Sequence, residues 1–200
     1  MLKKIKSFFF IRLLFSNISE KHKLNMIKYN KKLQKIVDIN LMNYKLFTGK
    51  YIVYKENGKV EEYNGFYDTL MFEGEYLNGK RHGKVKQYDN LGYLIFEGKY
   101  MNGMRNGKGR EYDFFGCILF EGEYINGERN GKGKEFNEFG YLMFDGEYLN
   151  GNKWNGKGYN GNKIIYEMKD GKAYVKEYNN LNELIFEGEY LNGQRNGKGK

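Results

Sequence analysis

The sequence is poor in the residue types that build disulfides and metal sites. Its 200 residues contain no proline, one cysteine and two histidines. A single cysteine, Cys117, rules out an intramolecular disulfide and is typical of a reducing compartment. No cysteine and histidine residues have the spacing of metal ligands. We therefore expect no metal site and no cofactor.

The sequence also lacks a long hydrophobic run. Arg12 interrupts the longest apolar stretch, Phe8 to Phe15, whereas a membrane-spanning helix needs about 20 apolar residues. The same arginine, and the absence of a small-residue cleavage pattern after it, disfavour a secretory signal peptide. We expect a cytoplasmic protein that is peripheral to a membrane if it meets one.

Glycine and aromatic residues are abundant instead. The chain has 27 Gly, 19 Tyr and 15 Phe, with a mean hydropathy of −0.80. Its positive charge is confined to one end: residues 1–46 contain eleven basic and two acidic residues, and residues 47–200 contain 23 of each. A uniformly basic nucleic-acid-binding array is therefore disfavoured, because phosphate binding needs a net basic face.

Residues 1–46 predict a basic, aromatic-rich segment with a short helix, which we call the N-terminal segment. Ser19 is a candidate N-cap, and Met26, Tyr29, Leu33 and Ile36 form one apolar stripe at helical spacing. The segment is interpreted as a cap on the following array, as an interfacial anchor, or, from a loose likeness, as the short helical region of F-box proteins. An anchor would bring aromatic and basic residues to an anionic membrane surface or to a partner. Its candidate contacts are Lys3, Lys4, Lys6, Phe8, Phe9, Phe10, Arg12 and Phe15.

Residues 47–200 form an array of repeated units. An aromatic residue opens each unit, with a spacing of 24 residues in the centre: Phe47, Phe72, Phe96, Phe120, Phe144, Tyr166 and Phe186. Such a period indicates a repeat architecture. An Asn-Gly pair between two short apolar runs predicts a type I′ hairpin turn. A second turn is expected near residues 89–92, 113–116 and 137–140, so each unit predicts two strands.

Period-two alternation predicts two different faces for these strands. Phe72, Gly74 and Tyr76 share one face, where glycine leaves a furrow for aromatic rings that stack from unit to unit. Glu73 and Glu75 lie on the opposite face. The lysine columns of the Gly-Lys-Gly segments are expected to pair with these carboxylates on adjacent strands.

This pattern resembles a known repeat family. The segment Phe96-Glu-Gly98-Lys-Tyr100-Met-Asn-Gly103-Met-Arg-Asn-Gly107-Lys-Gly109 is similar to the MORN (membrane occupation and recognition nexus) repeat. The resemblance covers residues 47–200, strongly in five units and weakly in those opened by Phe47 and Tyr166. It implies an all-β fold, a single-layer antiparallel β-sheet of stacked hairpins, and a role in scaffolding, protein binding or membrane association. Val85 and Met168 replace expected glycines, and the shortened unit at Tyr166 predicts a bend or irregular edge.

No residue of the array is expected to be catalytic. His82 stands where sister units have Asn106, Asn130, Asn155 and Asn196. The carboxylate pairs recur in every unit, whereas an active site is normally unique. We therefore expect a non-enzymatic protein.

Candidate partner contacts lie where the units carry large aromatic side chains. Trp154, the single tryptophan, is interpreted as a replacement for the arginine of sister units, such as Arg105, and as a candidate binding hot spot. The other candidates are the strand tyrosines Tyr76, Tyr100, Tyr124, Tyr148 and Tyr190.

We therefore expect a scaffold or protein-interaction module that binds a protein partner and is tethered to a membrane or partner by its N-terminal segment. An open strand edge in the unfinished last unit predicts self-association. Two alternatives stay open. One is a regulatory or targeting fragment of a larger MORN-containing enzyme, although no catalytic domain fits before Lys200; the other is an antitoxin-like repeat protein.

Overall fold

The computed structural model describes residues 13–18, 22–23, 26, 31–36, 49–179 and 183–196. Contacts divide the chain into two compact units, Met1–Val53 with Glu62–Leu70 and Tyr54–Glu61 with Met71–Lys200. In the first unit, residues 13–16 are helical and α3 spans Lys31–Ile36, which confirms short helical structure in the N-terminal segment. Ser19 and Tyr29 lie outside the described residues. The predicted boundary at residue 46 stays a prediction.

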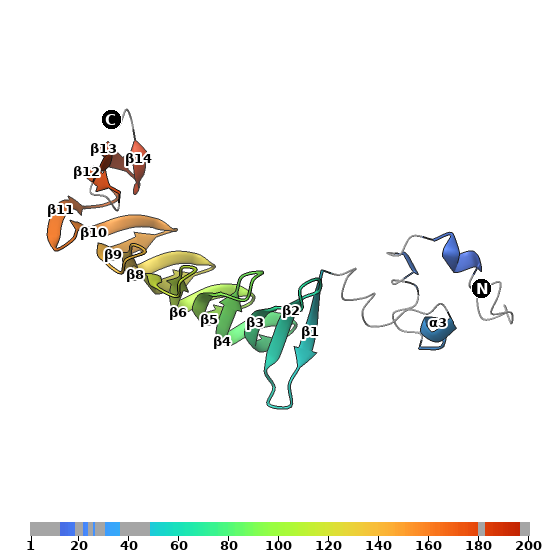
Figure 1. Cartoon of the computed structure of the whole chain (residues 1–200). Helices are drawn as coiled ribbons and strands as arrows, with labels where there is room; N and C mark the ends of the chain where they lie inside the picture. The colour runs from blue at the N-terminus through green and yellow to red at the C-terminus, as the bar shows by residue number, and fades with distance from the viewer. Residues whose placement is uncertain are drawn as a thin grey trace. The chain divides into compact units, whose positions relative to one another are not determined.

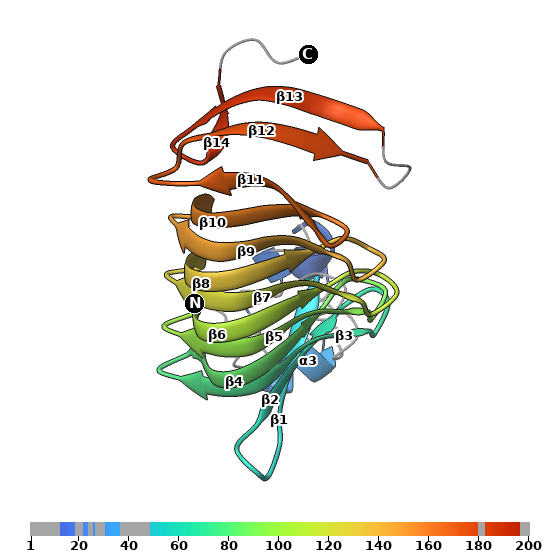
Figure 2. The same cartoon turned by 90° about the vertical axis from the view of Figure 1, so that its left-hand side faces the viewer.

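The rest of the described chain is antiparallel β-structure, as predicted. The strands are β1 Lys50–Tyr54, β2 Val60–Asn64, β3 Leu70–Leu77, β4 Lys80–Tyr88, β5 Leu94–Met101, β6 Met104–Tyr112, β7 Ile118–Ile125, β8 Glu128–Phe136, β9 Leu142–Leu149, β10 Asn152–Asn160, β11 Lys163–Met168, β12 Ala173–Tyr178, β13 Leu184–Leu191 and β14 Gln194–Asn196. Strands β1 to β11 follow one another in an 11-stranded sheet, and β12 to β14 form a second sheet (Figure 1). Figure 2 shows β4 to β10 side by side in chain order.

Two kinds of turn join the strands. At the Asn-Gly turns both residues have positive φ, for example 51° at Asn78 and 73° at Gly79, which confirms the predicted turn chemistry because only such residues tolerate it at low cost. The turns on the other edge are closed by an acidic or amide side chain. The Asp89 carboxylate accepts hydrogen bonds from the backbone N–H groups of Leu91 and Tyr93, each at 2.9 Å.

Hydrogen bonds also join successive Asn-Gly turns from Gly103 onward to the preceding unit. The Gly103 N–H donates to the Arg81 carbonyl, and the Gly127 N–H donates to the Arg105 carbonyl, both at 2.9 Å. This series of bonds, the turn ladder, fixes the register of neighbouring units at one edge of the array.

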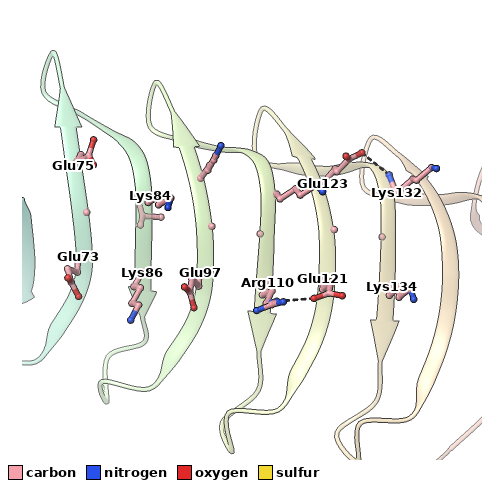
Figure 3. A pocket seen from close by; sticks show the side chains of 18 of the residues that line it. Glu73, Glu75, Lys84, Lys86, Glu97, Arg110, Glu121, Glu123, Lys132 and Lys134 are labelled. Carbon is pink, nitrogen blue, oxygen red and sulfur yellow. Dashed lines mark hydrogen bonds and ion pairs between the residues drawn. The ribbon is translucent and has the colours of Figure 1, made fainter.

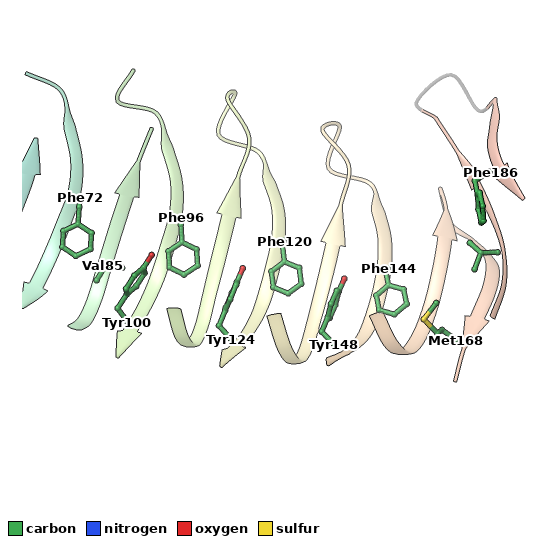
Figure 4. Packing of buried hydrophobic residues seen from close by; sticks show 11 residues of the cluster. Phe72, Val85, Phe96, Tyr100, Phe120, Tyr124, Phe144, Tyr148, Met168 and Phe186 are labelled. Atoms are coloured by element: carbon green, nitrogen blue, oxygen red, sulfur yellow. The ribbon is translucent and has the colours of Figure 1, made fainter. Parts of the chain in front are cut away.

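The core is a row of aromatic rings on one face of the sheet (Figure 4). Phe72, Phe96, Phe120 and Phe144 have no exposed surface. Each central phenylalanine contacts two tyrosines edge to face: the Phe120 ring lies 5.6 Å from that of Tyr124 in its own unit and 5.1 Å from that of Tyr148 in the next unit. Each of these ring contacts contributes about 0.5–1.5 kcal/mol beyond burial. A single hairpin is only marginally stable, so the contacts between adjacent units stabilise the array.

Glycines make room for these rings, as the sequence predicted. Six of them oppose one another across β5 to β10, namely Gly98, Gly109, Gly122, Gly133, Gly146 and Gly156. A methyl group on Gly133 would lie 2.5 Å from Cζ of Phe120, well inside a normal carbon contact. Val85 opposes Gly98 at one end of this glycine row, and Met168 opposes Gly156 at the other.

The predicted irregularity of the unit at Tyr166 is present, because the sheet divides between β11 and β12. Tyr166 takes the phenylalanine position, but its ring stacks on Phe144 with an interplanar angle of 24° instead of meeting it edge to face. Met168 fills space that a glycine leaves open elsewhere and is buried. The turn ladder nevertheless continues across this division: the Gly171 N–H donates to the Trp154 carbonyl and the Gly193 N–H donates to the Gly171 carbonyl, both at 2.8 Å.

Candidate interaction surfaces

Basic side chains cover the aromatic face. The guanidinium groups of Arg105 and Arg129 lie 4.1 and 4.0 Å from the ring centres of Phe96 and Phe120, within the range of cation–π attraction. Arg105 also pairs with the Glu111 carboxylate at 2.6 Å, and Arg129 contacts its second oxygen. Because rings and ion pairs fill this face, it is a packed layer and not an open furrow.

Electrostatics favour the ionised form of the Glu111 carboxylate and the neutral forms of the Tyr148 and Tyr190 phenols. Burial opposes ionisation of Glu111, but the hydrogen bond and charge of Arg129 outweigh it, so the pKa of Glu111 is lowered. Burial, followed by the charge of Glu135, raises the pKa of Tyr148, whose hydroxyl donates to the Glu135 carboxylate at 3.2 Å. Burial and the Glu177 carboxylate raise the pKa of Tyr190 to about 12. These groups hold neighbouring units together.

The strand tyrosines predicted as partner contacts belong to this packed layer. Tyr100, Tyr124 and Tyr148 are buried, with exposed fractions of 8, 2 and 4 %. Tyr76 and Tyr190 are partly buried and pack against the same cluster. Their role in packing is therefore clear, and a partner contact through them stays a prediction.

The structure corrects the interpretation of Trp154. Lys153, and not Trp154, opposes Tyr148, as Arg129 opposes Tyr124 in the preceding unit. Lys153 also reproduces the arginine contacts, with its Nζ 5.2 Å from the Phe144 ring and 2.8 Å from the Glu135 carboxylate. Aligning the units by their Gly-Lys-Gly segments placed Trp154 at the arginine position. In the structure, the bulge between Lys153 and Asn155 shifts the register of β10, so Lys153 takes that position.

Trp154 therefore sits at that bulge, beside the division between the two sheets. It is half-buried, and a methyl group on Gly171 would lie 2.8 Å from its Cζ3. Its side chain thus packs against the next turn of the ladder. A partner contact at Trp154 stays a prediction.

The opposite face carries a charged groove of about 940 Å³ that crosses β3 to β9 (Figure 3). Its floor has two rows of side chains that run from strand to strand. In the first row acidic and basic residues alternate through opposed positions: Glu73, Lys86, Glu97, Arg110, Glu121, Lys134 and Asp145. Arg110 pairs with Glu121 at 2.9 Å, and Lys134 pairs with Asp145 at 3.6 Å.

The second row of the charged groove lies two residues away along each strand. It contains Glu75, Lys84, Lys99, Lys108, Glu123 and Lys132. The lysines of the Gly-Lys segments, predicted to form the ion pairs, are in this row. One of them, Lys157 on β10, pairs with Glu167 on β11 at 3.6 Å, as predicted. On the groove face of β4 to β9 the ion pairs described come from the first row.

Exposed apolar side chains line the loops at one edge of the array. We call Leu91, Tyr93, Phe114, Phe115, Phe139 and Tyr141 the loop ridge; each is between 40 and 84 % exposed. The rings of Tyr93 and Phe114, from successive loops, lie 4.1 Å apart, so the ridge continues from unit to unit. This surface was not predicted from the sequence, although apolar residues recur before the loop glycine at positions 91, 115 and 139.

The N-terminal residues predicted to contact a membrane lie almost entirely outside the described chain. Lys3, Lys4, Lys6, Phe8, Phe9, Phe10 and Arg12 are all outside it. Phe15 is described and buried, beside exposed Leu13 and Leu14. Within the described ranges, no helix has the length and apolar character needed to cross a bilayer. The described histidines, cysteines and carboxylates form no cluster that could hold a metal ion.

Two solved structures have a distant likeness to this chain. A mutant of S. aureus TarM in complex with fondaparinux, alpha-GlcNAc-glycerol and UDP is 10 % identical, with a TM-score of 0.36, over 68 % of this chain and 26 % of that chain. TarM itself is 10 % identical, with a TM-score of 0.34, over 72 % of this chain and 27 % of that chain. The present chain thus spans about a quarter of the length of these structures, and the likeness carries no functional argument.

The comparison with protein families agrees with the repeat geometry. The model of the MORN repeat matches residues 72–84, 96–113, 120–136 and 186–200. No curated protein matches the chain significantly. MORN repeats are commonly protein- or membrane-interaction modules and are typically non-catalytic. With its stacked hairpins, ring-filled glycine row and four matching stretches, the chain is a MORN-repeat protein.

Proposed function

We propose that this chain is a non-enzymatic scaffold that binds a protein partner through the loop ridge. The observation that carries the proposal is the run of exposed apolar side chains on consecutive loops. Phe115 is 84 % exposed and Phe139 is 63 % exposed. Fully burying such a side chain contributes about 1.5–3 kcal/mol, and Phe and Tyr are enriched in the buried centres of interfaces.

The backbone of these loops is closed by side chains other than the exposed aromatic ones. The Asp113 carboxylate closes its loop by accepting hydrogen bonds from the N–H groups of Phe115 and Cys117, at 2.9 and 2.8 Å. The rings of Phe114 and Phe115 contact each other with centres 5.4 Å apart and remain largely exposed. The array leaves the apolar surface of these rings in water, so a partner that covers them gains the free energy of burying it.

The test is to replace Phe114, Phe115 and Phe139 with serine and to measure partner capture and the affinity of the purified partner. A matched control replaces Leu77, Ile125 and Leu149 with serine, because these side chains are exposed on the Asn-Gly edge. We expect the ridge variant to lose the partner and the control to keep it. Equal binding by both variants would reject the loop ridge as the contact surface.

The N-terminal segment supplies a second element of the proposed function. We propose that its basic and aromatic residues tether the scaffold to an anionic membrane surface, with each basic residue near the surface worth about 1 kcal/mol. Its charge supports this, since residues 1–46 hold eleven basic and two acidic residues. Sedimentation with vesicles containing phosphatidylserine should fall when residues 1–46 are deleted. Equal sedimentation of both forms would reject the tether and leave the loop ridge untouched.

A further inference from the structure

One lysine breaks the charge pattern of the second groove row. In the described units, Glu75, Glu123 and Glu147 follow the strand glycine, whereas Lys99 stands at this position in β5. The register opposes Lys108 to Glu123 and Lys132 to Glu147. In the affected unit the register opposes Lys84 to Lys99. Like charges directly opposite one another destabilise a sheet.

This exception produces a basic patch across three adjacent strands. Lys84 on β4, Lys99 on β5 and Lys108 on β6 are all exposed and line the charged groove. Within the part of the chain that the structure describes, none of these three lysines forms an ion pair. The first row adds Lys86 and Arg110, with Glu97 between them. Arg110 pairs with Glu121 and Lys108 opposes Glu123, so the pair that lacks opposed carboxylates is Lys84 and Lys99. At the other positions of the second row given above, a lysine faces a carboxylate on the next strand, whereas Lys84 faces Lys99.

The next unit shows what the patch lacks. There the Glu123 carboxylate lies over Gly131 and accepts a hydrogen bond from the Lys132 N–H at 3.1 Å. In the affected unit the stem of Lys99 takes the equivalent place, since a methyl group on Gly107 would lie 3.6 Å from its Cδ. An ammonium group donates hydrogen bonds and accepts none. The site is therefore built like a carboxylate site but holds no carboxylate of its own.

We propose that this basic patch binds an acidic segment of the protein partner, with carboxylates placed among Lys84, Lys99 and Lys108. The inference rests on the proposed function and names the chemistry of the partner. Charge complementarity and the carboxylate position in the sister unit both favour Asp or Glu side chains over a neutral ligand. Three strands spaced by about 4.8 Å span about 10 Å, which an extended chain crosses in about three residues. A short acidic cluster is sufficient.

The experiment titrates the full chain with a fluorescent oligoglutamate peptide of about ten residues, with oligoglutamine as the neutral control. Lys99→Glu restores the alternation of the second row, so the variant should stay folded. We expect it to weaken oligoglutamate binding about tenfold, as an attraction becomes a repulsion. Binding should also weaken with added salt.

Glu123→Lys is the matched gain-of-function variant. It extends the run of lysines to the next unit, between Lys108 and Lys132, and should strengthen oligoglutamate binding. In the Lys99→Glu background it should restore most of the lost affinity by moving the patch along one unit. Unchanged affinity in both single variants would overturn the proposal. Tighter, Lys99-dependent binding of inorganic tripolyphosphate than of oligoglutamate would overturn the peptide assignment in favour of a phosphate ligand.

This test is separable from that of the proposed function. If the ridge variant loses its partner while Lys99→Glu binds oligoglutamate as before, the scaffold function stands and the acidic segment is rejected. If no form of the chain captures a partner, the scaffold function fails. The oligoglutamate titration then still decides whether the patch binds carboxylates.

Discussion

Gly122→Ala tests the central claim about the core, that aromatic rings occupy the space above the glycine row. The added Cβ would lie 2.6 Å from Cζ of Phe120, 2.7 Å from Cα of Gly133 and 2.8 Å from the carbonyl oxygen of Lys132. Normal contacts between carbons are about 3.5–4.0 Å. The ring would have to shift by about 1 Å, and the two backbone atoms belong to the neighbouring strand, where movement breaks ladder hydrogen bonds.

The magnitude follows from these contacts. Overpacking costs about 1–3 kcal/mol, and the rigid backbone neighbours place Gly122→Ala at the upper end. Loss of glycine entropy in the unfolded chain offsets about 0.4–1 kcal/mol. We expect a net loss of about 2 kcal/mol in the free energy of unfolding. Gly74→Ala should cost less, about 1 kcal/mol, because its closest contacts are side-chain atoms, Cγ1 of Val85 at 2.8 Å and Cζ of Phe72 at 2.9 Å.

Urea unfolding followed by circular dichroism and by Trp154 fluorescence measures both variants. Lys134→Ala, on the groove face, serves as the surface control, with an expected change within about 0.5 kcal/mol. Replacing Phe120 with leucine in the Gly122→Ala background should recover part of the loss, because a smaller side chain leaves room for the new methyl group. A cost at Gly122 equal to that of the surface control would refute the packing argument.

Three further predictions concern the ion pairs and phenols of the aromatic face. Glu111→Gln should lower stability at pH 7 by removing the carboxylate that pairs with both Arg105 and Arg129. Because the pKa of Glu111 is lowered, its contribution to stability is present above the unfolded pKa and is lost as pH falls through the folded pKa. In urea titrations, the free energies of unfolding of the variant and the native chain should differ at neutral pH and converge at acid pH. The pKa of Tyr190 is raised to about 12. The contribution of Tyr190 to stability is therefore present below about pH 10 and is lost as pH rises through the folded pKa. Phenolate absorbance should follow alkaline unfolding, and Tyr190→Phe should lose less stability than the native chain as pH rises. Lys153→Met removes the pair with Glu135 and should cost less than about 1 kcal/mol in thermal unfolding, and a larger loss would mean that Lys153 has a further role.

Local chemistry made much of the fold predictable. The Asn-Gly turns at Asn78 and Asn102 follow from the positive φ that these residues tolerate, and alternation placed Phe96 and Gly98 on the ring face. The irregular unit at Tyr166 could be predicted from its shortened length, because a unit that has lost residues cannot keep the spacing of its neighbours. These features depend on neighbours within one or two strands, which a repeat displays in its sequence.

Register and side-chain reach were not predictable in the same way. The sequence could not show that Arg105 folds over Phe96 or bridges to Glu111, because this requires the bulge geometry of β6. The assignment of Trp154 to the arginine column was wrong for the related reason that the bulge in β10 differs. The loop ridge was missed because turn residues were interpreted by backbone chemistry, while the exposure of Phe115 depends on the adjacent loops.

The turn ladder has a consequence for how the array can change its length. From Gly103 onward, one glycine N–H and one carbonyl join successive units at the turn edge, as from Gly127 to Arg105. The rings also reach only the adjacent unit. A unit can therefore be inserted or removed between two others without altering the bonds of distant units. Duplicating residues 96–119 should lengthen the chain by one hairpin in phase with its neighbours. It should also duplicate Lys99, and with it the one unbalanced position among the described residues of the charged groove.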